Sequence, residues 1–203
     1  MKASSAVVGA VLAGWFLVVL VAGRAGWFEA AASQPPLALL VAVFGPLLVF
    51  ALVHRASDAL RRFVLGLDLR LLTAMQAWRV IGVMFLALYA LGLLPGLFAW
   101  PAGVGDVAVG LAAPFVVLAM VRGAPAWRAR VAWLNIAGLI DFAGAIATGV
   151  LTSTSSVGFL ASGVSRASLG ALPLSLVPTF AVPLWTLMHV ISLLQLRRAS
   201  ASP

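Results

Sequence analysis

Four ionisable side chains interrupt the apolar segments of this sequence: Arg79, Asp106, Asp141 and His189. Burying a charge in an apolar environment is costly, so such residues are the first place to look for function. Asp141 lies about midway along an apolar segment. Helical spacing places it on a face of small residues, which suits close contact with another helix. Arg79 is a natural partner for this acid, because pairing neutralises both charges.

Each of these groups also has a purely structural interpretation. Asp141 could bond to a neighbouring helix and fix its packing, and the long side chain of Arg79 could extend to lipid headgroups. His189 could bond to a nearby carbonyl or hydroxyl group. If the three converge instead, with Asn135 and Gln76 as neighbours, they form a polar cluster that could relay protons or bind an anion. The sequence leaves both interpretations open.

The tetrapeptide Gly103-Val104-Gly105-Asp106 resembles the GxGD motif of intramembrane aspartyl proteases, which include presenilin-like enzymes and bacterial prepilin peptidases. The resemblance implies a dyad in which Asp106 and Asp141 share a proton and activate water. Three features depart from those families. The partner aspartate follows the motif, no Pro-Ala-Leu element comes after it, and we expect the two aspartates at depths that differ by ~10 Å.

A simpler interpretation of this stretch is structural. Pro101, Gly103 and Gly105 favour a tight turn after the third apolar segment. Asp106 would then stand at the start of the fourth helix, where a carboxylate caps free N–H groups and meets the positive end of the helix dipole. We therefore expect Asp106 to be a capping acid at the outer mouth of the protein.

We predict no catalytic residue, metal or cofactor. The chain has no cysteine, which excludes disulfides, thiolate ligands and iron–sulfur clusters. His54 and His189 could together hold a haem, although His54 stands beside Arg55 and is expected to face headgroups. Two histidines and two aspartates at different depths lack the spacing of a zinc site. No P-loop, dinucleotide fingerprint or nucleic-acid module occurs.

The elements that must position these residues are helices in a membrane. Of the 203 residues, 64% are hydrophobic and 9% charged, which a soluble domain does not accommodate. We expect an all-α integral membrane protein, a compact single domain (residues 1–203) of six transmembrane helices. The apolar segments are close to the ~20 residues that a bilayer helix needs. They span approximately 6–22, 37–53, 72–94, 107–121, 131–151 and 176–196.

The basic residues predict the orientation. With the N-terminus inside, ten of them fall on the inner side and only Arg24 and Arg166 on the outer side. Both termini should therefore be cytoplasmic. The inner set is Lys2, Arg55, Arg61, Arg62, Arg70, Arg122, Arg128, Arg130, Arg197 and Arg198. We expect these residues to contact anionic lipid headgroups and not nucleic acid. One lysine against twelve arginines, with abundant Ala and Gly, suggests a bacterial inner-membrane protein.

The inner loop from Arg55 to Leu72 has two interpretations. It could form an amphipathic surface helix whose Phe63, Leu65 and Leu67 face the acyl boundary. It could also simply extend the second and third transmembrane helices into the cytoplasm.

For function, we expect a small proton- or solute-translocating protein, similar to a transporter or channel, in which the polar cluster lines a cavity. The alternative is a non-catalytic membrane subunit or assembly partner, whose small-residue faces pack a second copy or another membrane protein. A membrane haem protein or an intramembrane enzyme is the third class.

Overall fold

The computed structural model describes residues 2–29, 34–153, 158, 160 and 169–201, and this part of the chain contains helices and no strands. The helices are α1 (Lys2–Arg24), α2 (Leu37–Ala56), α3 (Asp58–Leu65), α4 (Leu69–Ala74), the 3-10 helix η1 (Met75–Gly82), α5 (Val83–Ala90), α6 (Gly96–Val121), α7 (Trp127–Leu151), the π-helix η2 (Val177–Ala181) and α8 (Val182–Ala201).

Within the described residues, six helices are long and apolar enough to cross a membrane, as the sequence predicts. Four of them are α1, α2, α6 and α7; α4, η1 and α5 run together as one, and η2 with α8 forms another. The observed bounds lie within a few residues of the predicted ones, except in the fourth. That helix begins at Gly96 instead of Val107.

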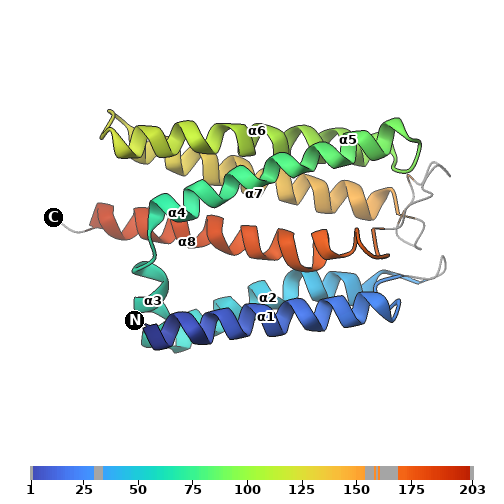
Figure 1. Cartoon of the computed structure of the whole chain (residues 1–203), viewed down its shortest axis with the longest axis horizontal. Coiled ribbons are helices and arrows are strands. Elements are labelled where there is room, and N and C mark those ends of the chain that lie inside the picture. Colours follow the sequence, from blue (N-terminus) through green and yellow to red (C-terminus); the bar gives the residue numbers. More distant parts are fainter. Residues whose placement is uncertain (1, 30–33, 154–157, 159, 161–168, 202–203) are drawn as a thin grey trace.

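The helices lie side by side, so that the bundle has two distinct ends (Figure 1). α1 begins and α8 ends at the same end, which also carries α3 and the connection from α6 to α7. We call this the terminal end. α1, α5 and α7 end, and α2, α6 and η2 begin, at the opposite, far end.

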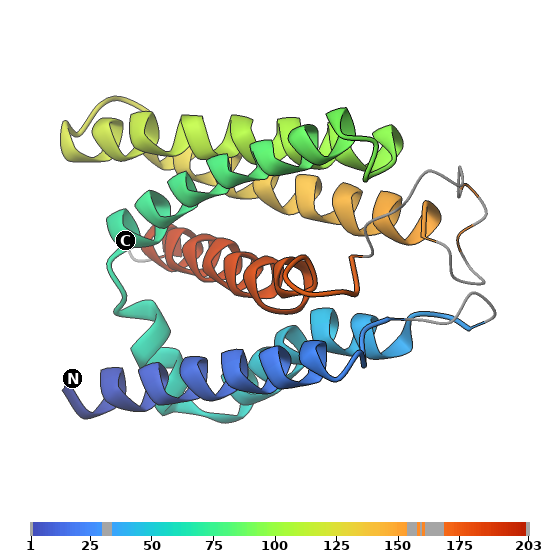
Figure 2. The same ribbon diagram turned by 45° about the vertical axis from the view of Figure 1, so that its right-hand side comes forward.

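One group of helices forms the main packing unit. The segment η1–α5 and the helix α7 both pack against α6, and α8 packs against α7 on one side and α2 on the other. α8 therefore lies between this group and the α1–α2 pair (Figure 2). Two apolar clusters fill the group, one around Val109 and Val131 toward the terminal end and one around Phe85 and Phe98 toward the far end. The polar residues lie between them.

The contact between η1 and α6 is close because glycine stands at it. In a 3-10 helix, residues three apart lie directly above one another. Gln76, Arg79 and Gly82 accordingly form a buried stripe along η1. On α6, a Cβ at Gly110 would lie 2.6 Å from the backbone nitrogen of Val80, so any side chain there would push the two helices apart.

The inner loop contains the short separate helix α3. The Ser57 hydroxyl caps it by accepting from the Leu60 N–H at 3.2 Å. Phe63, Leu65 and Leu67 are partly buried against the cluster of Val64, Leu72 and Ile191. Of the two interpretations of this loop, the structure shows the separate helix, and whether its exposed side contacts lipid stays a prediction.

A single side chain of α8 fixes this loop against the bundle. The Gln195 amide donates to the Val64 and Leu67 carbonyls at 2.8 and 3.0 Å. These bonds pull the loop onto α8 and give its apolar side chains a protein surface to cover.

The close approach of η1 and α6 leads to a stability prediction. Replacing Gly110 with leucine should lower the free energy of unfolding by about 1–3 kcal/mol, because the new side chain overlaps the η1 backbone. Thermal unfolding in detergent, followed by loss of the monodisperse size-exclusion peak, measures the effect. Gly144→Leu on α7 is the matched control, since a Cβ there meets nothing within 4 Å. Equal unfolding temperatures for the two variants would contradict the prediction.

Candidate functional site

Arg79 is the centre of the polar residues, and its side chain is fully buried. Its Nε donates to Asp106 Oδ1 at 2.7 Å, and its Nη2 donates to Asp141 Oδ2. Its Nη1 faces the Gly138 carbonyl oxygen at 3.5 Å and His189 Nε2 at 3.0 Å. Every nitrogen of the guanidinium therefore has a partner, and the partners come from α6, α7 and α8.

The contact with Arg79 determines the protonation state of His189. A guanidinium has only donors, so His189 Nε2 must accept with its lone pair. The ring proton is then on Nδ1, which donates to Asn135 Oδ1 at 2.7 Å. The Asn135 amide nitrogen donates in turn to the Val131 carbonyl at 2.7 Å, which orients its oxygen toward the ring. His189 is therefore neutral in this arrangement.

Phe142 closes the cluster on the side of α7. The guanidinium carbon of Arg79 lies 3.9 Å from the centre of its ring, within the range of a cation–π contact. The ring centres of Phe142 and His189 are 5.9 Å apart. Phe142 thus excludes water from the guanidinium without competing for its hydrogen bonds.

Two glycines give the charged side chains their space. A Cβ at Gly105 on α6 would overlap the Asp141 carboxylate, and a Cβ at Gly138 on α7 would overlap the His189 ring and lie 2.6 Å from Arg79 Nη1. Only glycine at these positions allows the four helices to approach closely enough for one guanidinium to reach all of its partners.

A second polar layer lies one turn toward the terminal end. Gln76 comes three residues before Arg79 on η1, Asn135 three before Gly138 on α7, and Ser192 three after His189 on α8. All three side chains are buried. Both polar atoms of the Gln76 amide lack a partner among the described protein atoms, as is typical of a group that holds an ordered water.

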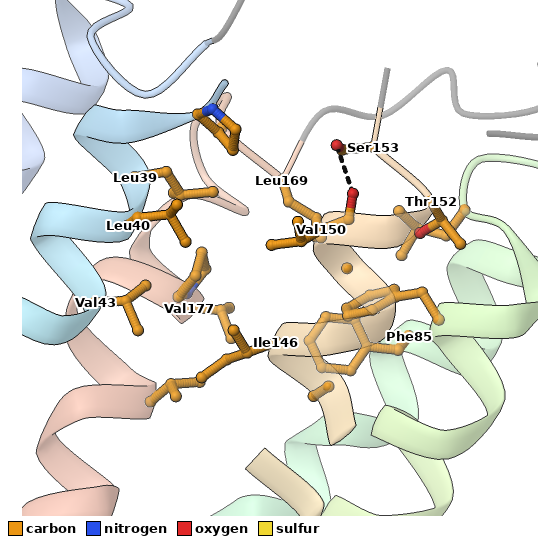
Figure 3. A pocket seen from close by; sticks show the side chains of 18 of the residues that line it. Leu39, Leu40, Val43, Phe85, Ile146, Val150, Thr152, Ser153, Leu169 and Val177 are labelled. Atoms are coloured by element: carbon orange, nitrogen blue, oxygen red, sulfur yellow. Dashed lines mark hydrogen bonds between the residues drawn. The ribbon is translucent and has the colours of Figure 1, made fainter. Parts of the chain in front are cut away.

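On the opposite side of the cluster, a cavity of about 220 Å³ extends toward the far end. α2 contributes Leu39, Leu40 and Val43 to one wall, and Phe85 and α7 stand across the space from them (Figure 3). Asp106 is the one charged residue that lines it, and most of the remaining surface is apolar. The cavity thus connects the far end of the bundle with a carboxylate that binds Arg79.

Asp106 is not the capping residue that the sequence predicts. The residue before the first turn of α6 is Pro95, and Asp106 lies well inside the helix. Pro101, Gly103 and Gly105 are helical as well. Turn chemistry misleads here because apolar surroundings offer the backbone no water, so the chain stays helical and only the missing N–H of proline interrupts its hydrogen bonds.

The expected difference in depth between the two aspartates is also wrong. Asp106 and Asp141 bind the same guanidinium. Among the described residues, however, each carboxylate bonds to Arg79 and not to the other carboxylate. A protease dyad needs two carboxylates that share one proton. This is an ion-pair triad in which arginine separates the acids.

Among the described residues, His54 and His189 contact different partners. His54 is on α2, where its ring stacks on Phe50 with centres 5.5 Å apart. Both nitrogens of His189 are engaged, with Arg79 and with Asn135. An iron at His189 would have to break one of these bonds, so the arrangement does not fit the haem alternative.

The charges of the cluster do not balance. One guanidinium is paired with two carboxylates, and His189 is neutral, so the group carries a net charge of −1 when both acids are ionised. An unmatched charge in a buried site is costly. The cluster can reach neutrality by taking up one proton or one other cation.

The triad also predicts a stability pattern. Arg79→Leu should cost about 3–5 kcal/mol, because it leaves two buried carboxylates without their counter-ion. The triple variant that adds Asp106→Asn and Asp141→Asn should recover part of this loss. Unfolding by a denaturing detergent, followed by tryptophan fluorescence, measures both. Arg70→Leu, at an exposed arginine of α4, is the control. If Arg79→Leu were as stable as Arg70→Leu, the role given to the triad would be refuted.

Comparisons with known proteins place the chain in one family. Residues 35–197 match the model of a domain of unknown function, DUF8737. The match begins just before α2 and covers every residue of the polar cluster, whereas α1 lies outside it. No curated protein and no solved structure matches the chain significantly. Because the match covers most of the sequence, the chain belongs to the DUF8737 family.

Proposed function

We propose that this protein is a multi-pass membrane protein that moves protons, alone or together with a small solute, through the cluster of Arg79, Asp106, Asp141 and His189. The observation that carries the proposal is the unbalanced ion-pair triad: one buried guanidinium bound to two carboxylates. Such a group takes up and releases one positive charge at little structural cost. Intramembrane ion-pair clusters of this kind are typical of proton and ion pathways.

The surroundings of the triad on its two sides support the proposal. The cavity reaches Asp106 from the far end. Toward the terminal end, Asn135, Gln76 and Ser192 continue the polar path by one further turn. The unpartnered amide of Gln76 provides a site for a water between the cluster and the terminal end. A proton would thus enter at a carboxylate and leave through the histidine side.

The hydrogen bonds suggest an order of events. A proton that binds Asp106 or Asp141 removes the charge that holds one nitrogen of Arg79. The guanidinium then shifts toward the remaining carboxylate and releases His189 Nε2. The freed Nε2 accepts the proton of the carboxylic acid, which makes the ring an imidazolium whose Nδ1–H still donates to Asn135. Loss of one proton from the imidazolium to a water restores the neutral ring. Return of Arg79 to both acids resets the cluster.

Proton flux tests this function directly. Proteoliposomes that hold a pH-sensitive dye and carry an imposed potential should acidify faster than empty liposomes. Asp141→Asn should reduce the rate at least tenfold, because the cluster then loses a carboxylate that takes up the proton. Asp58→Asn, at an exposed acid of α3, should keep the full rate. Wild-type protein that is folded but gives no flux under any imposed gradient would overturn the proposal.

The positive-inside distribution of basic residues orients the pathway. We propose that the terminal end faces the cytoplasm of a bacterial cell, with its arginines at anionic headgroups, so that the cavity is reached from outside.

Cysteine labelling tests this orientation cleanly, since the natural chain has no cysteine. Glu29→Cys at the far end should react with a membrane-impermeant maleimide in intact cells. Asp58→Cys at the terminal end should react only after the membrane is disrupted. Both residues are exposed. The reverse pattern would show that the cavity opens to the cytoplasm.

A second function is favoured by one specific observation. α1 lies outside the family match, and Gly9 and Gly14 on it face open space. A subunit or assembly partner could pack a helix closely against α1 at either of these glycines. Gly14→Leu should then abolish co-purification with the partner and leave flux unchanged.

A further inference from the structure

We propose that the far-end cavity binds a small amphiphilic organic cation, such as an alkyl- or arylammonium, with its charge at Asp106 and its apolar body among the cavity walls. This inference rests on the proposed function, since it names the solute whose movement the triad would couple to protons. It adds a ligand class that the triad alone does not specify.

The walls determine the apolar part of the ligand. α2 contributes aliphatic side chains to one side of the cavity, while Phe85, Phe98 and Phe142 come from the opposite helices. The rings of Phe85 and Phe98 meet edge to face, with centres 5.2 Å apart. A purely polar solute would lose its hydration here without gaining partners, which disfavours sugars, amino acids and inorganic anions.

The charge of the ligand follows from Asp106. Asp106 is the one charged group among the lining residues, and the described residues give its carboxylate one hydrogen bond, from Arg79 Nε. The triad behind it lacks one positive charge. A cation at Asp106 supplies that charge, while an anion would add a second unmatched negative charge.

The aromatic rings near the acid strengthen this choice. Phe142 already receives the guanidinium of Arg79 on its ring, so Phe85 and Phe98 are the lining rings that remain for a second weakly hydrated cation. Organic ammonium groups are attracted to ring faces and lose little hydration on burial. The volume of about 220 Å³ lies below the ~300–1,000 Å³ of common ligand pockets, which limits the solute to one ring or a few short alkyl groups.

The same site can therefore hold either a proton on a carboxylate or an organic cation beside it. Occupation by the cation makes protonation of Asp106 unfavourable, and protonation removes the charge that holds the cation. Competition of this kind is what couples the exchange of a solute for protons.

Equilibrium dialysis of radiolabelled benzyltrimethylammonium against purified protein in detergent tests the ligand class. We expect saturable binding. The neutral near-isostere 2-methyl-1-phenyl-2-propanol should compete at least tenfold more weakly, because it fills the same space without the charge. Equal competition by the neutral compound would show an apolar pocket without cation selectivity and overturn the proposal.

Two matched pairs of variants locate the binding. Asp106→Asn should weaken binding at least tenfold, whereas Asp58→Asn should not. Gly149→Leu should abolish binding, because its side chain extends between Phe98 and Leu169 into the cavity. Gly144→Leu, on the open side of the same helix, should bind normally. If Asp106→Asn fails to fold, the comparison of Gly149→Leu with Gly144→Leu decides whether the cation binds in this cavity. Binding that survives Gly149→Leu would place the cation elsewhere and refute the assignment.

The proposed function and the cation site can be refuted independently of each other. Cation binding without proton flux in liposomes would refute the proposed function and leave the site assignment standing. Proton flux in protein that shows no saturable cation binding would refute the site assignment and leave the proton pathway standing.

Discussion

The structure depends on one constraint: a buried guanidinium must have a hydrogen-bond acceptor for each of its nitrogens. Arg79 lies between two apolar clusters, where water cannot meet this need. The acceptors come from three other helices, namely Asp106 on α6, Asp141 and Gly138 on α7, and His189 on α8. Separating any one of these helices would take from the buried guanidinium at least one of its acceptors.

The same constraint shapes the backbones of η1, α6 and α7. η1 adopts the tighter 3-10 form, which stacks Gln76, Arg79 and Gly82 along one line. Gly105 and Gly138 stand where the carboxylate and the imidazole need room. Glycine usually weakens a helix in water, but in apolar surroundings the gain from close packing outweighs that cost.

The surroundings of the cluster are asymmetric, and this asymmetry is what suggests a direction. Toward the far end the neighbours are aromatic and aliphatic, with a cavity among them. Toward the terminal end they are the neutral hydrogen-bonding groups of Asn135, Gln76 and Ser192. An apolar entrance suits an organic solute, and a chain of amides and hydroxyls suits a proton. The triad is the point at which the two kinds of path meet.

The sequence by itself determined that the chain forms six long apolar helices, because hydrophobicity and length are local properties. It also singled out Arg79, Asp141 and His189 as candidates for a cluster, since ionisable groups in apolar segments stand out by type, but it placed Asp106 outside that cluster. It failed where local patterns are ambiguous. Proline and glycine around Asp106 resemble a turn, yet they are helical. Interpreted as a turn, they predict Asp106 at the start of a helix and not in its interior.

Only the tertiary structure decided which of these residues meet and what lies beside them. The shared contact of Asp106 and Asp141 with Arg79, the tautomer of His189 and the cavity beneath α2 all arise between helices that are far apart in the chain. Spacing along one helix fixes which residues share a face. It does not fix the rotation or depth of one helix against another, which follow from how glycines, aromatic rings and charges fit together in the packed bundle.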